Sequence, residues 1–144
     1  MATIYKHTQF GTLLVTVIGI LGLAVILFAP LPGTGYIIVL LFLLALALFY
    51  SLTVEISDQY INLSFGIGFI TKHFEIKDVR QVKPVKIRWY YGWGIRWIFD
   101  GWLYNVSGID AVEIIMATGK KYVIGTDEPE QLVRAILSSS GLNR

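Results

Sequence analysis

The chain has 144 residues, of which 55% are hydrophobic and 15% charged, with a formal net charge of +2 and no cysteine. Disulfide bonds and cysteine-based metal, redox or nucleophilic sites are therefore excluded. The near-neutral balance lacks the basic excess that marks nucleic-acid-binding proteins, so no nucleic-acid partner is expected.

One long segment has no formal charge, because residues 7–54 contain no Asp, Glu, Lys or Arg. A hydrocarbon core of ~30 Å needs ~20 apolar helical residues. The run therefore predicts two transmembrane helices, at 10–29 and 36–53. The prolines and glycines of residues 30–35 predict a short loop between them, since helices rarely continue through such residues. A cleaved signal peptide is disfavoured, because the first apolar core is long and lacks a small-residue cleavage pattern.

A hairpin of this kind places the N-terminal segment 1–9 and the chain after residue 54 on the same side of the membrane. Basic residues occur at Lys6 and after the second span but not between the spans. The positive-inside rule then favours a multi-pass inner-membrane protein with both termini in the cytoplasm. Neither span carries an ionisable group, which argues against a pump or transporter. Gly19 and Gly22 fit either packing between the two helices or an oligomer contact.

Residues 54–138 predict one small β-rich domain, followed by a tail at 139–144. Alternating apolar residues predict strands at 60–65 and 69–76, and another at 79–87 that Pro84 interrupts. A further pair of strands, at 111–116 and 120–125, is joined by the tight turn Thr118-Gly119.

A helix is predicted from about 127 to 138. Asp127 is expected at the N-cap, Pro129 in the first turn, and Glu130 as the acid of a capping box. The apolar residues Leu132 and Ile136 belong to one stripe along this helix. Such a stripe can cover one end of a strongly bent sheet.

Four segments carry a resemblance to a known family: Ser51-Leu52-Thr53-Val54-Glu55, the run from Trp89 to Arg96, the run from Gly101 to Gly108, and the run from Lys120 to Pro129. Together with the order of elements, they resemble small bacterial membrane proteins that join two N-terminal transmembrane helices to a bacterial pleckstrin-homology-like domain. The resemblance covers essentially the whole chain. It implies an α-helical transmembrane hairpin plus a PH-like β domain of two antiparallel sheets and roughly seven strands, capped by a C-terminal amphipathic helix. It implies no assigned activity, and it raises the expectation of a homo-oligomer because related domains form rings.

Basic and aromatic residues are concentrated in one segment of the domain. All four tryptophans fall within residues 89–102, and residues 79–99 contain no acid. The candidate lipid- or partner-binding residues are Arg80, Lys83, Lys86, Arg88, Trp89, Tyr90, Tyr91, Trp93, Arg96, Trp97, Trp102 and Tyr104. Three interpretations stay open: contact with an anionic bilayer surface, a protein interface, and rings that fill a long loop and part of the core.

No residue pattern names a reaction. His7 and His73 show no metal-ligand spacing. The segment Gly66-Ile67-Gly68 is a strand turn rather than a dinucleotide loop, because Thr71 fills the last glycine position. The acids at 127–130 are explained by capping, and Asp100 alone is too little for acid–base catalysis. No catalytic, cofactor or metal site is therefore predicted.

The sequence predicts a membrane-anchored PH-like binding or assembly module without catalytic activity, holding its basic and aromatic face at the inner leaflet. Its expected partners are the lipid bilayer and anionic lipid headgroups. The alternative is a homo-oligomeric scaffold or an accessory subunit of a larger membrane complex, with the aromatic segment as the protein interface.

Overall fold

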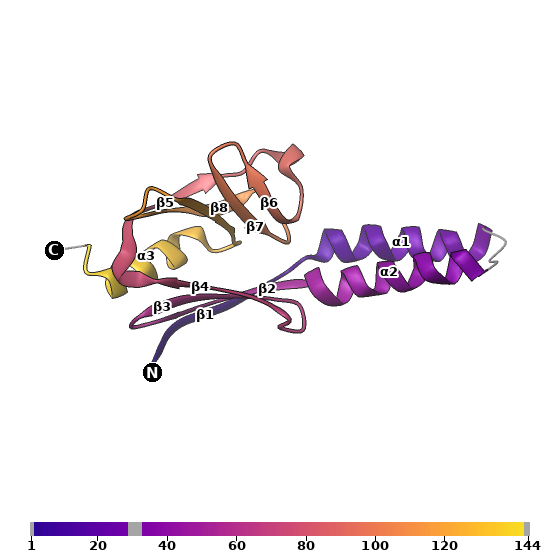
Figure 1. Ribbon diagram of the computed structural model, residues 1–144, viewed down its shortest axis with the longest axis horizontal. Coiled ribbons are helices and arrows are strands. Elements are labelled where there is room, and N and C mark those ends of the chain that lie inside the picture. The colour runs from indigo at the N-terminus through magenta and orange to yellow at the C-terminus, as the bar shows by residue number, and fades with distance from the viewer. Residues whose placement is uncertain (1, 29–32, 143–144) are drawn as a thin grey trace.

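A computed structural model describes residues 2–28 and 33–142, which form two β-sheets, a helical hairpin and a C-terminal helix (Figure 1). The strands are β1 (Thr3–Phe10), β2 (Ser51–Ser57), β3 (Tyr60–Phe65), β4 (Ile70–Glu75), β5 (Val79–Lys86), β6 (Gly94–Ile98), β7 (Gly101–Asn105), β8 (Asp110–Met116) and β9 (Lys121–Gly125). The α-helices are α1 (Thr12–Phe28), α2 (Gly33–Phe49) and α3 (Pro129–Ser140), and two short 3₁₀ helices are η1 (Ile76–Asp78) and η2 (Trp89–Tyr91).

The helical hairpin is shorter than the sequence predicts. Helices α1 and α2 have 17 residues each, which corresponds to a rise of about 25 Å, against a hydrocarbon core of ~30 Å. Across residues 2–28 and 33–142, no helix is long and apolar enough to cross a membrane. The predicted transmembrane helices at 10–29 and 36–53 are therefore wrong. The membrane-protein fold class and the multi-pass inner-membrane location that depended on them are wrong as well.

The hairpin is shorter because strands take both ends of the charge-free run. Phe10 pairs with Ser51 across β1 and β2, and Gly11 donates its backbone N–H to the Tyr50 carbonyl at 2.8 Å. Of the loop predicted at 30–35, residues 30–32 lie outside the described residues, and Gly33 already begins α2.

The first sheet, sheet A, is antiparallel throughout and has the order β1-β2-β3-β4. Its edge strand β1 comes from the segment predicted to lie outside the domain, and His7 pairs there with Val54. Sheet A is therefore built from chain on both sides of the hairpin, which fixes α1 and α2 at one end of it (Figure 1).

The second sheet, sheet B, has the order β5-β8-β9-β7-β6 and contains one parallel pair, β7 with β9, in which Trp102 lies opposite Tyr122. The prediction of two antiparallel sheets is therefore wrong for sheet B. One of the three open interpretations placed the aromatic segment in a long loop, but residues 94–105 form the antiparallel hairpin β6–β7, with Trp97 opposite Trp102. This hairpin joins the sheet beside β9, after a connection that carries η2.

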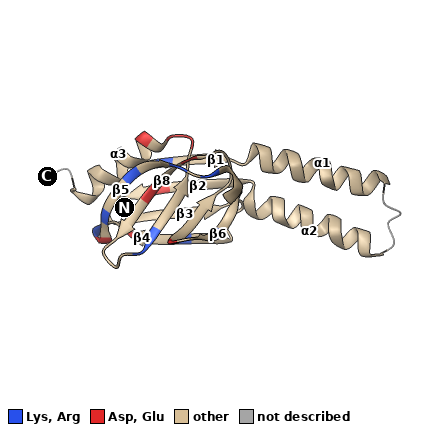
Figure 2. Cartoon of the chain, turned by 90° about the horizontal axis from the view of Figure 1, so that it is seen from above, with Lys and Arg blue, Asp and Glu red and all other residues tan. Residues whose placement is uncertain are grey.

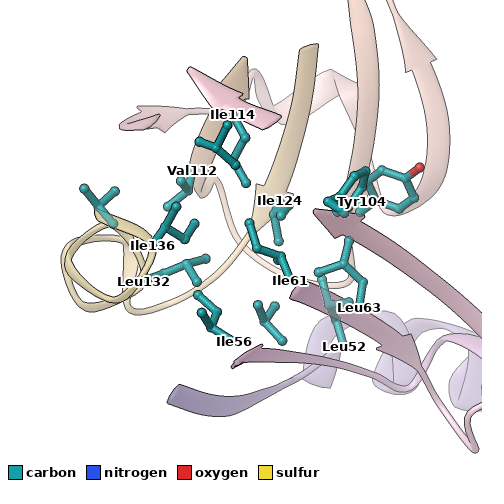
Figure 3. Packing of buried hydrophobic residues seen from close by; sticks show 14 of the residues in the cluster. Leu52, Ile56, Ile61, Leu63, Tyr104, Val112, Ile114, Ile124, Leu132 and Ile136 are labelled. Carbon is teal, nitrogen blue, oxygen red and sulfur yellow. The ribbon is translucent and has the colours of Figure 1, made fainter. Parts of the chain in front are cut away.

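The main core lies between the two sheets, and α3 closes one end of it (Figure 3). Ile61 and Leu63 come from sheet A, Ile124 from sheet B, and Leu132 and Ile136 from α3; each of these five side chains is at most 1% exposed. The apolar stripe predicted for the C-terminal helix is thus the face that packs on the core.

The start of α3 differs from the predicted capping box. Glu128 occupies the N-cap and makes no side-chain capping hydrogen bond. Its backbone N–H donates to the Thr126 hydroxyl at 3.1 Å. The Asp127 carboxylate turns instead toward strand β1, where its Oδ1 lies 2.6 Å from Nε2 of His7.

Candidate functional site

The helical hairpin carries a broad apolar surface with no charge on it. No residue of α1 is buried, and in α2 only Gly35 is. The exposed large apolar side chains of the two helices are Leu13, Val15, Val17, Ile20, Leu21, Leu23, Ile26, Leu27 and Phe28, followed by Tyr36, Ile37, Ile38, Leu40, Leu41, Leu43 and Leu44. Figure 2 shows no Lys, Arg, Asp or Glu on the described residues of α1 and α2, and the charged residues lie in the rest of the chain. A contiguous apolar patch of this kind marks an interaction surface.

The two glycines of α1 have different surroundings. A Cβ on Gly22 would lie 3.8 Å from the Phe42 ring, an ordinary van der Waals contact, so this glycine faces α2. A Cβ on Gly19 would meet no heavy atom within 4 Å. Both glycines line the apolar groove between α1 and α2, and at Gly19 this groove is open.

The base of the hairpin meets the domain in an apolar groove of about 260 Å³. Its lining includes Leu14 and Ile18 of α1, Phe49 of α2, Trp93 just before β6, and Ile95 on β6. Among the predicted site residues, Trp93 thus lies against the hairpin, at the point where the apolar surface ends.

The β3–β4 turn also contacts the hairpin, and sequence reasoning assigned it no binding role. Its Ile67 N–H donates to the Ala47 carbonyl at 3.2 Å. The Ile67 and Phe69 side chains are 58% and 80% exposed. The signal that could have found this surface is two large apolar residues in a glycine turn, where polar residues are usual.

The predicted basic and aromatic residues do not form one face. Arg80, Lys83 and Lys86 lie on β5, whereas Arg96 and Trp97 lie on β6. These strands are the opposite edges of sheet B. With ~4.8 Å between neighbouring strands, the two edges are roughly 19 Å apart. The basic residues that lie close together in the sequence are therefore separated between two edges of the sheet.

The connection between these edges carries Arg88 and the three aromatic residues of η2. Tyr91 and Ile87 pack on a small second cluster that contains Leu103, so part of this segment fills the structure. Trp89 and Tyr90 point outward and are 83% and 53% exposed. The Arg88 guanidinium donates to the Tyr90 hydroxyl. Only part of the aromatic segment is thus free to bind.

Two of the predicted lipid-binding lysines are engaged by acids. Lys83 Nζ lies 3.1 Å from Oε1 of Glu113, and Lys121 Nζ lies 2.8 Å from Oε2 of the same carboxylate. Lys86 lies 3.8 Å from Asp110. Glu113 is 8% exposed. Burial raises the pKa of its carboxyl, but hydrogen bonds from Lys121 and Lys83 outweigh burial, and the net pKa is lowered.

The substitution Glu113→Gln is expected to lower the free energy of unfolding by about 1–3 kcal/mol at neutral pH, because two ammonium groups lose a buried charged acceptor. Because the pKa of Glu113 is lower in the folded protein than its ordinary value of 4.5, the ionised carboxylate stabilises the fold at pH values above 4.5. This stabilisation is lost as the pH falls through the pKa of the folded protein. Urea unfolding should therefore show a gap between wild type and variant at pH 7 that narrows at pH 3.

The matched control is Asp110→Asn, which removes a longer and more exposed pair. It should change the free energy of unfolding by less than ~1 kcal/mol. An equal gap for Glu113→Gln at both pH values would contradict the assigned role of the carboxylate.

A cavity of about 390 Å³ opens between β4 of sheet A and strands β6, β7 and β9 of sheet B. Its aromatic lining consists of Trp97, Trp102, Tyr104 and Tyr122. The two indole rings meet edge to face, with centroids 5.4 Å apart. Three predicted site residues, Trp97, Trp102 and Tyr104, are therefore brought together here.

Lysines from two other segments complete the cavity. Lys121 is engaged by Glu113 and by Asp100, whose Oδ2 lies 3.0 Å away. Lys72 and Lys120 also line the cavity, and within residues 2–28 and 33–142 neither forms an ion pair. Sequence reasoning missed both, because neither belongs to the segment where basic residues are concentrated.

The histidines take structural positions. His7 lies between Asp127 and Glu128, with Nδ1 3.4 Å from the latter's Oε2, and so links β1 to the start of α3. His73 is exposed on β4 and bonds Asn62. In the part of the chain that the structure describes, no three His, Cys, Asp or Glu residues are grouped to hold a metal ion.

Comparison with known proteins does not assign the chain to a family, and the resemblance to PH-like domains stays a prediction. No family model matches the chain, and no curated protein matches it.

Proposed function

We propose that the chain is a lipid-bound binding module in which acyl chains cover the apolar hairpin and the two-sheet domain stands at the bilayer surface. The observation that carries this proposal is the charge-free surface of α1 and α2, much of which is exposed within residues 2–28 and 33–142. The proposal requires immersion of the hairpin in acyl chains. It does not require either helix to cross the bilayer.

The physical support is the free energy of burying this surface. Transferring a fully exposed Leu, Ile or Phe side chain out of water is worth ~1.5–3 kcal/mol. Many such side chains lie on both helices. Because the helices contain no Asp, Glu, Lys or Arg, their burial in lipid does not incur the free-energy cost of burying a charge. Lipid supplies an apolar environment without a specific complementary shape, which suits a hairpin that is apolar on all sides.

The base of the hairpin supports the same proposal. Trp93 lies in the groove between the hairpin and β6, and indole rings favour the headgroup layer of a bilayer. The hairpin projects away from both sheets along the long axis of the molecule (Figure 1). Immersion of the two helices as far as this groove would leave the charged domain in water.

The domain is proposed to bind rather than to catalyse. Of the described residues that line the aromatic cavity, Asp100 is the single acid, and Lys121 holds its carboxylate. A general acid or base needs a group free to exchange a proton with a substrate. An anion-binding role suits the cavity better, since its remaining charges are lysines.

The test is flotation of the full chain with neutral phosphatidylcholine vesicles in a density gradient. The chain should float with the vesicles, and it should still do so in 1 M salt, because apolar burial is not screened. A discrete oligomer that stays at the bottom of the gradient would overturn the proposal. That outcome would favour the alternative, in which a second copy of the chain covers the hairpin.

A further inference from the structure

We infer that the cavity lined by Lys72, Lys120 and the aromatic rings binds the phosphate of an anionic lipid headgroup. This inference rests on the proposed function and assigns a ligand class to that site. The site lies at strands β6, β7 and β9, away from the edge of sheet B that β5 forms. The basic residues that the sequence singled out on β5 are not part of it.

The charges of the cavity favour an anion. Lys121 balances the one carboxylate there, Asp100, at 3.0 Å. Lys72 from β4 and Lys120, which immediately precedes β9, have no acidic partner among the described residues, so the cavity keeps excess positive charge. Lysine ammonium groups bind phosphate oxygens through short, charge-assisted hydrogen bonds.

Neutral donors add to the two lysines. The Tyr104 and Tyr122 side chains line the cavity, and Figure 3 shows the Tyr104 hydroxyl pointing away from the apolar cluster. Burial and the neighbouring Tyr122 raise the pKa of the Tyr104 phenol, which therefore keeps its proton and can donate it.

The position of the cavity favours a lipid as the source of the phosphate. Ile95 lines both this cavity and the apolar groove at the hairpin base, so the two adjoin at this residue. Trp97 is two residues farther along β6, or about 7 Å at 3.3 Å per residue. The headgroup layer on each side of a bilayer is ~5–7 Å thick. With the hairpin immersed to its base, a lipid in the groove would carry its headgroup to the cavity.

The test uses the full chain and vesicles of phosphatidylcholine with or without phosphatidic acid, a phosphate-bearing anionic lipid. Intrinsic tryptophan fluorescence reports on the site, because Trp97 and Trp102 line it. Phosphatidic acid should change the emission of vesicle-bound wild type in a saturable way. In the double variant Lys72→Gln, Lys120→Gln, the apparent affinity for it should fall at least tenfold.

The charge-matched control is Lys77→Gln, Lys86→Gln, since these lysines are exposed and lie outside the cavity. It should weaken the affinity less than threefold. An equal loss in both double variants would show general attraction to the surface and overturn the inference, as would no loss in the first variant. Displacement of the lipid signal by millimolar inorganic phosphate would show a free anion as the ligand and would overturn the lipid assignment.

Failure of this inference is distinguishable from failure of the proposed function. A chain that does not float with neutral vesicles would overturn the proposed function. A chain that floats with neutral vesicles but gives no response to phosphatidic acid that depends on Lys72 and Lys120 would overturn the headgroup site alone.

Discussion

Replacing Ile20 and Leu40 by lysine is expected to abolish flotation of the full chain with neutral vesicles. These side chains are 63% and 64% exposed, one on each helix of the hairpin. A lysine placed in an apolar phase costs ~2.5–3.5 kcal/mol. Two such charges should lower the partition into lipid by more than about a thousandfold. Vesicle flotation with a fluorescent lipid tracer measures this directly.

The control places the same charges on exposed apolar residues outside the hairpin. Ile4 on β1 and Ile109 before β8 are 46% and 42% exposed. The variant Ile4→Lys, Ile109→Lys should float like the wild type. Circular dichroism should be unchanged in both double variants, because all four positions are exposed. Normal flotation of the hairpin variant would mean that the apolar helices do not hold the chain on lipid.

The charge-free run predicts a helical hairpin that is too long, because residues at both ends of the run form strands instead of helix. Leu52 and Val54 belong to the charge-free run, yet each is at most 3% exposed in β2, in the core of sheet A. The periodicity of a short apolar run does not distinguish a buried strand from a buried helix. Pairing of β2 with β1 and β3 decides between them, and such long-range pairing is not encoded in local periodicity.

The candidate cavity was only half predictable for a similar reason. Trp97 and Trp102 stand out in the sequence because they are near each other in a segment of unusual composition. Lys72 and Lys120 come from distant segments of ordinary composition. These two lysines lie near the tryptophan rings only because β4 is an edge strand of sheet A and β9 runs parallel to β7. Composition can reveal the aromatic half of such a site, while the cationic half depends on topology.

The attachment of the hairpin to the domain gives the last prediction, that Gly66→Ala lowers the free energy of unfolding by about 2–4 kcal/mol. Gly66 has φ +50°, a conformation that costs a non-glycine residue ~1–3 kcal/mol. A Cβ there would lie 2.2 Å from the Ala47 carbonyl oxygen and 2.7 Å from that of Leu48. These are backbone atoms of α2, so relief of the clash requires the β3–β4 turn to move away from the hairpin. Urea unfolding of the full chain in one fixed detergent measures the loss.

The control is Gly19→Ala, where a Cβ meets nothing within 4 Å and the helix should gain ~0.5–1 kcal/mol. Comparison of the two variants thus distinguishes an effect on helix propensity, at Gly19, from an effect on the contact between hairpin and domain, at Gly66. If the Gly66 variant unfolds like the wild type, the turn does not fix the hairpin. If it loses stability as expected, the hydrogen bond from Ile67 to Ala47 is part of a rigid joint. The proposed headgroup site needs such a rigid joint, because the cavity beside Ile95 keeps a fixed distance from the immersed helices only while the hairpin keeps its angle to the domain.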